Sequence, residues 1–198
     1  MFSIPTSIEI NGTSYAIRNN GDFRMVLDVF SALNDIELEE KERIACALII
    51  FYSDINDLVD LNQIDGDLIE ELVKQMFWWM NCGQPESLGA QPHKLIDWDS
   101  DSQIICAAVN KVANTEIRSM QYLHWWTFMG YFSEVGESTL STVVSIRNKI
   151  VKGKKLEKYE NEFRRNNPQY FNWNSKTAQE REEDELIKEL WNGGMNNG

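Results

Sequence analysis

Residues suited to catalysis or metal binding are scarce in this chain. Its only histidines are His93 and His124, so it has neither an HExxH motif nor a face with two histidine ligands. It also lacks a GxSxG nucleophile elbow and a GxxxxGK[ST] phosphate loop. These absences argue against the common zinc, serine-hydrolase and P-loop nucleotide chemistries.

Cysteine pairs and long apolar runs are lacking too. The cysteines Cys46, Cys82 and Cys106 are an odd number without CxxC spacing, and we expect them to be reduced thiols. No apolar run approaches the ~20 residues of a membrane span, and the N-terminus does not have the basic-then-apolar order of a signal peptide. The sequence therefore predicts no membrane partner and no secretion.

Positive charge is in short supply. The 31 Asp and Glu residues exceed the 19 Lys and Arg residues and give a net charge of -12, which repels a phosphate backbone. Nucleic acid is not an expected partner. The basic residues gather between Arg147 and Arg165, and we interpret this run as a solvated face that could also dock the acidic tail of a neighbouring copy.

The fold class predicted is mainly α, with an N-terminal β-hairpin, a multi-helix bundle and a C-terminal acidic helix. Asn11-Gly12 favours a tight turn between two alternating segments, Ile8–Ile10 and Tyr15–Arg18. We expect one hairpin-plus-helical domain over residues 1–165 and an extension over 166–198. Apolar periodicity and capping residues predict helices over about 22–33, 39–52, 65–82, 101–112, 115–132 and 138–152, and a short one from Thr177.

Three alternating aspartates, Asp97, Asp99 and Asp101, resemble the first ligands of a calcium loop. Ser102 and Ala108 stand where that loop needs glycine and a bidentate glutamate, so we predict helix capping instead. We expect no metal and no cofactor.

An aromatic segment, Leu123-His124-Trp125-Trp126-Thr127-Phe128, follows on the predicted helix 115–132. His124 is interpreted as a hydrogen-bonded structural imidazole. The two adjacent tryptophans point about 100° apart on a helix, so one can face the core and the other its rim. Large aromatic and apolar side chains anchor protein interfaces, although core packing is an alternative for each of them. The predicted partner-contact residues are Tyr122, Trp125, Trp126, Phe128, Met129, Leu190 and Trp191.

Three segments together resemble one protein family. They are Asp97 to Ala108, Leu123 to Phe128 and Val144 to Ile150, and the chain is similar over about residues 8–165 to the gene-product-fifteen family of tailed bacteriophages. The resemblance implies a tail assembly chaperone in the host cytoplasm that self-associates and coats the tape measure protein while tail tube protein polymerises. It implies no catalysis.

The sequence is compatible with two alternative functions. The chain could be a permanent structural component of the phage tail or connector. It could also be a metal-dependent hydrolase that uses Asp97, Asp99 and Asp101.

Overall fold

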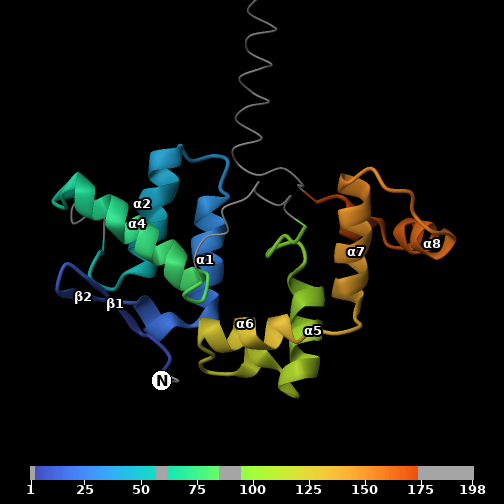
Figure 1. The fold of residues 1–198 in the computed structure, drawn as a ribbon, viewed down its shortest axis with the longest axis horizontal. Helices are drawn as coiled ribbons and strands as arrows, with labels where there is room; N and C mark the ends of the chain where they lie inside the picture. Colours follow the sequence, from blue (N-terminus) through green and yellow to red (C-terminus); the bar gives the residue numbers. More distant parts are fainter. Residues whose placement is uncertain (1–2, 57–61, 85–94, 174–198) are drawn as a thin grey trace, which may run out of the picture. The chain divides into compact units, whose positions relative to one another are not determined.

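The computed structural model describes residues 3–56, 62–84 and 95–173 (Figure 1). The chain divides into two compact units, residues 1–88 with 105–136 and residues 89–104 with 137–198. The mainly α fold with an N-terminal hairpin is confirmed. The predicted C-terminal acidic helix, with Leu190 and Trp191, lies outside the described residues, and the domain boundary at residue 165 stays a prediction.

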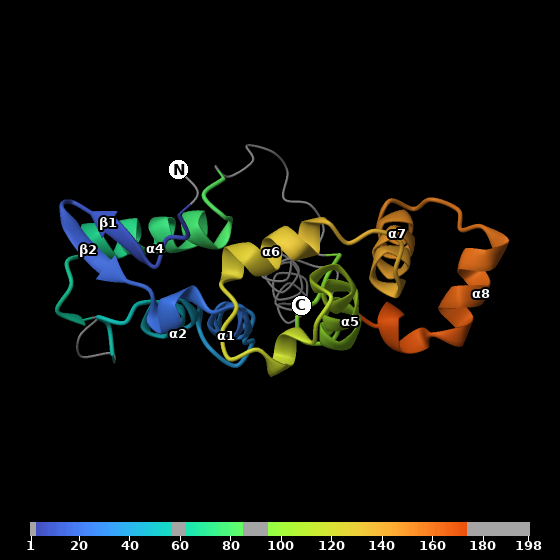
Figure 2. The same cartoon turned by 90° about the horizontal axis from the view of Figure 1, so that it is seen from below.

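The hairpin forms where the sequence predicts it. Strands β1 (Ser7–Ile10) and β2 (Thr13–Ala16) pair antiparallel, with Ile8 opposite Tyr15. Asn11 and Gly12 take φ values of 51° and 80°, the positive angles that a two-residue hairpin turn requires. Ile8 and Ile10 are buried on one face, and the hairpin lies beside helix α4 (Gly66–Met80) in both ribbon views (Figures 1 and 2).

Helices α1 (Phe23–Leu33) and α2 (Glu40–Phe51) form the centre of the first unit. Both begin as predicted. The Asp22 carboxylate accepts from the Arg24 amide at the start of α1, and Glu39 and Glu42 form a capping box at the start of α2. The apolar end of α2 is central, because Ala47, Leu48, Phe51 and Tyr52 are fully buried.

The aromatic helix is shorter than predicted. Helix α5 (Ser102–Ala113) begins after Asp101 as expected, but a 3-10 turn, η2 (Ile117–Ser119), and an extended segment precede helix α6 (Trp125–Ser133). The prediction that one helix runs from residue 115 to 132 is therefore wrong. Tyr122 lies before α6 and is therefore not on the aromatic helix.

Asp22 explains why the helix starts late. Its Oδ2 accepts from the Leu123 amide at 2.9 Å, and the Phe23 amide donates to Leu123 O at 2.9 Å. Asp22 and His124 form an isolated antiparallel bridge, so the backbone around Leu123 is extended and not helical. Arg24 reinforces this link, because its Nη1 bonds both Asp22 oxygens at 3.0 Å and its Nη2 donates to Met120 O at 2.7 Å.

The second unit contains helices α7 (Thr139–Val151) and α8 (Lys158–Asn166) and the 3-10 turn η3 (Pro168–Phe171). Ser138 and Ser141 form the capping box of α7, and Glu157 and Glu160 form that of α8. Lys149 binds Glu160 at 2.7 Å and joins the two helices. The hydrogen bond from Lys149 lowers the pKa of the Glu160 carboxyl.

A buried ion pair between Arg147 and Asp101 lies at the core of this unit. Both side chains are 1 % exposed, and the guanidinium binds the carboxylate in a fork, with Nη2 2.9 Å from Oδ1. The other N–H groups donate to Leu95 O and Tyr170 O, which employs all five guanidinium donors. The interpretation of the basic run as a solvated face is therefore wrong at Arg147.

The aspartates order the turn that precedes α5, and their capping of the helix itself stays a prediction. Asp97 Oδ1 accepts from the amides of Asp99 and Ser100, and Asp101 Oδ2 accepts from the Asp97 amide. Within the described ranges, no group of three or more His, Cys, Asp or Glu side chains is placed to hold a metal ion. No helix in the same ranges is both long and apolar enough to cross a membrane.

Replacing Asp101 by alanine would leave the Arg147 charge buried without its partner. Loss of one member of a buried pair costs about 3–5 kcal/mol, and we expect that reduction in the free energy of unfolding. The matched control is Asp67→Ala at an exposed position, with an expected change within about 0.5 kcal/mol. Urea titrations of the two variants measure the difference, and equal stabilities would contradict the structural role.

Candidate functional site

The indole groups of α6 close the C-terminal end of α4. A helix leaves its last carbonyls without intrahelical partners, and here Trp125 Nε1 donates to Met80 O at 2.7 Å. Trp126 Nε1 donates to Trp79 O at 2.9 Å, and this oxygen also accepts from the Cys82 amide. The two indole N–H groups thus supply hydrogen bonds to the last carbonyls of α4, as polar capping groups do at other helix ends. We call Trp78, Trp79, His124, Trp125 and Trp126 the aromatic junction.

His124 holds the start of α6 in place. Its Nδ1 accepts from the Trp126 amide at 3.0 Å as the N-cap, so the proton of the neutral ring sits on Nε2, which lies 3.1 Å from Pro5 O. Pro5 O also accepts from Trp79 Nε1 at 3.0 Å. Burial lowers the pKa of His124, while Pro5 O and Asp22 oppose part of this shift. The predicted structural role of this imidazole is confirmed.

A glycine lets the backbone approach the junction closely. Gly21 has φ of 75°, and a Cβ there would lie 2.6 Å from the Trp79 ring and 3.1 Å from His124 Nε2. No larger residue fits without displacing the indole. Glycine is therefore required at position 21 for steric reasons, because the backbone there lies directly against the Trp79 ring.

The predicted partner-contact residues divide into core and rim. Trp125 and Phe128 are 1 % exposed, and Phe128 stacks on Phe23 with ring centroids 4.9 Å apart. These two rings are core side chains, because they fill the space between α1 and α6, and they cannot form the aromatic surface predicted around them. Trp126 and Met129 are half-buried, and Tyr122 is 47 % exposed with its hydroxyl donating to Asn20 O.

Trp78 of α4 is the exposed aromatic side chain of the junction. Trp78 is 40 % exposed and meets Trp126 edge-on, with ring centroids 6.4 Å apart. It also lines a hollow of about 510 Å³ together with Val73 and Phe77. The signal in the sequence is its position beside Trp79, because adjacent residues of a helix point about 100° apart and a helix with one buried face directs one of the two toward the rim.

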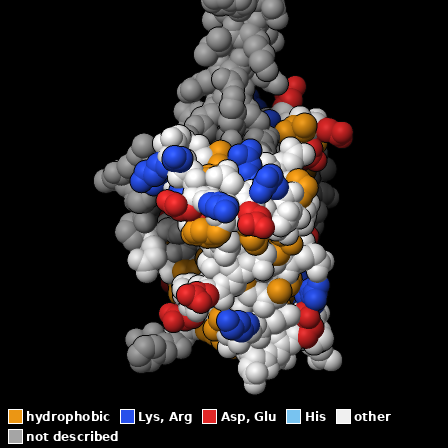
Figure 3. All heavy atoms as spheres, turned by 90° about the vertical axis from the view of Figure 1, so that its right-hand side faces the viewer, with side chains coloured by type: hydrophobic (Ala, Val, Ile, Leu, Met, Phe, Trp, Pro, Cys, Tyr) orange, Lys and Arg blue, Asp and Glu red, His pale blue; other side chains and the backbone are white. Residues whose placement is uncertain are grey.

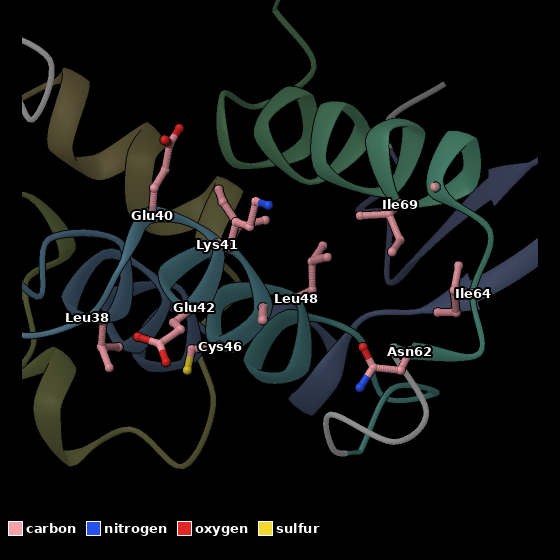
Figure 4. A pocket seen from close by; sticks show the side chains of 12 residues that line it. Leu38, Glu40, Lys41, Glu42, Cys46, Leu48, Asn62, Ile64 and Ile69 are labelled. Atoms are coloured by element: carbon pink, nitrogen blue, oxygen red, sulfur yellow. The ribbon is translucent and has the colours of Figure 1, made fainter.

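A larger groove lies between α2 and α4 (Figure 4). Its volume is about 930 Å³. Leu48 of α2 and Ile69 of α4 point toward the space between the two helices, and Ile64 lies on the segment that leads into α4. Exposed charged side chains, Glu40, Lys41 and Glu42, stand at the start of α2. An apolar floor with a charged end suits a peptide or a helix of a partner better than a small polar substrate.

Four side chains that could take part in chemistry are shielded or already bound to other groups. Burial raises the pKa of the Cys82 and Cys106 thiols, which disfavours the nucleophilic thiolate. Both ring nitrogens of His124 are engaged, and the Asp101 carboxylate is bound by Arg147.

One family of known proteins matches most of the chain. The family described as "Bacteriophage Gp15 protein" matches residues 2–171. The chain belongs to this family. No curated protein and no solved structure matches it. The resemblance inferred from the His124-Trp125-Trp126 segment and its neighbours is thus confirmed.

The two tryptophans should contribute unequally to stability. Trp125→Phe removes the donor to Met80 O in the core, and we expect a loss of about 2–4 kcal/mol from the unpaired carbonyl and the cavity. Trp126→Phe should cost about 1 kcal/mol, because Trp79 O keeps the Cys82 amide and the ring is half-buried. Thermal and urea unfolding compare the variants. A larger loss of stability in Trp126→Phe than in Trp125→Phe would contradict the roles assigned to the two indole hydrogen bonds.

Stability should depend on pH through His124. Its pKa is lowered in the folded chain, so below the ordinary value of about 6.5 the unfolded chain takes up a proton that the folded chain resists. The free energy of unfolding should therefore fall as pH is lowered from 7 to 5. His124→Asn keeps an N-cap acceptor and should flatten this dependence, whereas His93→Asn should not. An unchanged slope in His124→Asn would count against a neutral buried imidazole.

Proposed function

We propose that this Gp15-family chain is a noncatalytic tail assembly chaperone that binds the tape measure protein in the host cytoplasm. The observation that carries the proposal is the apolar groove between α2 and α4. Family membership supports a phage role, and the engaged state of His124 and Asp101 favours binding over catalysis.

The groove suits the apolar face of a helix. Ile44, Ile64 and Ile69 are half-buried, so each leaves apolar surface that a client can cover. Helices bind such grooves through apolar anchors spaced three and four residues apart. A tape measure protein, as a long helical rod, would offer such anchors repeatedly along its length, and many copies of the chaperone could then coat it.

Coating requires contacts between copies and with the tail tube. Exposed apolar side chains outside the groove, Ile4 and Trp78 among them, are candidates for contacts with neighbouring copies or with tail tube protein. The net charge of -12 would keep the unassembled chain soluble and away from nucleic acid. We therefore propose self-association and tube contact on apolar surface separate from the client groove.

A charge in the groove should abolish client binding. Ile69→Glu places a carboxylate where an apolar anchor would sit, and we expect affinity for the tape measure protein to fall about tenfold or more. Affinity is measured by titrating the full chain with tape measure protein, after circular dichroism has shown that the variant folds.

The matched control is Ile36→Glu, which makes the same change at a side chain that is 75 % exposed and lies outside the groove. It should bind as the unaltered chain does. A second comparison removes residues 177–198 and reports whether the C-terminal segment recruits the client. The proposal fails if the unaltered chain binds no tape measure protein, with or without that segment.

A further inference from the structure

The outer surface of α8 carries a hollow lined by cations. Lys158, Arg164 and Arg165 surround it together with Asn161, and its volume is about 500 Å³. All four side chains are exposed. No carboxylate of the described residues forms an ion pair with any of the three cations, whereas Lys149 of the same unit is already bound to Glu160. The hollow therefore offers unneutralised positive charge.

The space-filling view shows Lys and Arg side chains on the face that carries α8. In Figure 3, which faces the α8 side of Figure 1, Lys and Arg side chains gather in the upper half with a few carboxylates between them. Exposed Lys152, Lys154 and Lys155 lie in the segment between α7 and α8 and add to the positive charge of the unit. In a chain of net charge -12, such a surface calls for a negative partner.

A complementary segment follows in the same chain. Residues 180–189 contain six carboxylates and two cations. Only residues 174–179 separate Glu180 from Trp173, and six extended residues span about 20 Å. A helix of nine residues, the length of α8, is about 14 Å long.

The last described residues before that segment are held in the second unit, next to α8. The Arg147 guanidinium lies over the Trp173 ring, 4.7 Å from its centroid. Phe171 meets Phe163 of α8 edge-on, with ring centroids 6.3 Å apart. The acidic residues therefore begin within reach of the hollow, and the short connection gives them a high effective concentration there.

We propose that the hollow on α8 binds the acidic segment 180–189 of its own chain. The contact is electrostatic, with several exposed ion pairs that are weak singly and act together. It weakens with salt, because exposed charges are screened over about 10 Å at 0.1 M ionic strength. Docking holds Leu190 and Trp191 near the second unit, and a competing partner that binds either the hollow or the segment releases them.

The occupant is an acidic peptide and not a polynucleotide. Every copy of the chain carries the acidic segment 180–189 tethered to its own α8. A polynucleotide, by contrast, is repelled by the other carboxylates of the chain. The inference does not depend on the proposed chaperone function, because the unaltered chain alone suffices to test it.

Zero-length carbodiimide cross-linking of the full chain tests this contact. At low salt we expect mass spectrometry to find Lys158 joined to carboxylates of residues 180–189, with little joining of the exposed Lys41 to that segment. Reversing both arginines, Arg164→Glu with Arg165→Glu, should reduce the Lys158 cross-link about tenfold. Adding Glu182→Arg and Glu183→Arg should restore it through Asp184 and Glu185.

A matched control reverses Lys152 and Lys154 instead, which makes the same change in net charge outside the hollow. This variant should keep the cross-link, and circular dichroism checks that all variants fold. A cross-link that falls equally in the control, or that mixed isotope-labelled samples show only between copies, would overturn the proposal. Tight binding of an oligothymidine that depends on Arg164 and Arg165 would overturn it as well.

Discussion

The hydrogen bonds from the indoles of α6 to the last carbonyls of α4 fix the arrangement of the first unit. Trp125 and Trp126 donate to Met80 O and Trp79 O from the first turn of α6, and His124 and Asp22 define the start of that helix. The aromatic segment is therefore mostly a structural device. In this arrangement Trp78 is exposed, and another part of α4 lines the groove together with α2.

Local features of this fold could be predicted from the sequence, and long-range ones could not. The hairpin at Asn11-Gly12 and the caps at Asp22 and Ser138 depend on residues near one another in the chain. The late start of α6 depends on a bond between residues 101 positions apart, which no local pattern encodes. The apolar periodicity of the sequence therefore predicted a helix that begins at residue 115, about ten residues too early.

The burial of Arg147 is a second feature that depends on a residue distant in the sequence. Within a run of cations Arg147 resembled a solvated residue, yet it continues the stripe of Leu140 and Val143 on α7 at helical spacing. A charge within an apolar stripe indicates a buried partner, and Asp101 is that partner. The groove could not be predicted either, because it depends on how Leu48 and Ile69 of separate helices meet.

A client-bound footprint tests the central claim most directly. Hydrogen exchange of the full chain, alone and saturated with tape measure protein, reports which amides a client protects. The account predicts added protection at residues 38–48 and 62–69, with the already buried segment 124–128 unchanged. Protection confined to segments outside the groove, or none at saturation, would contradict it.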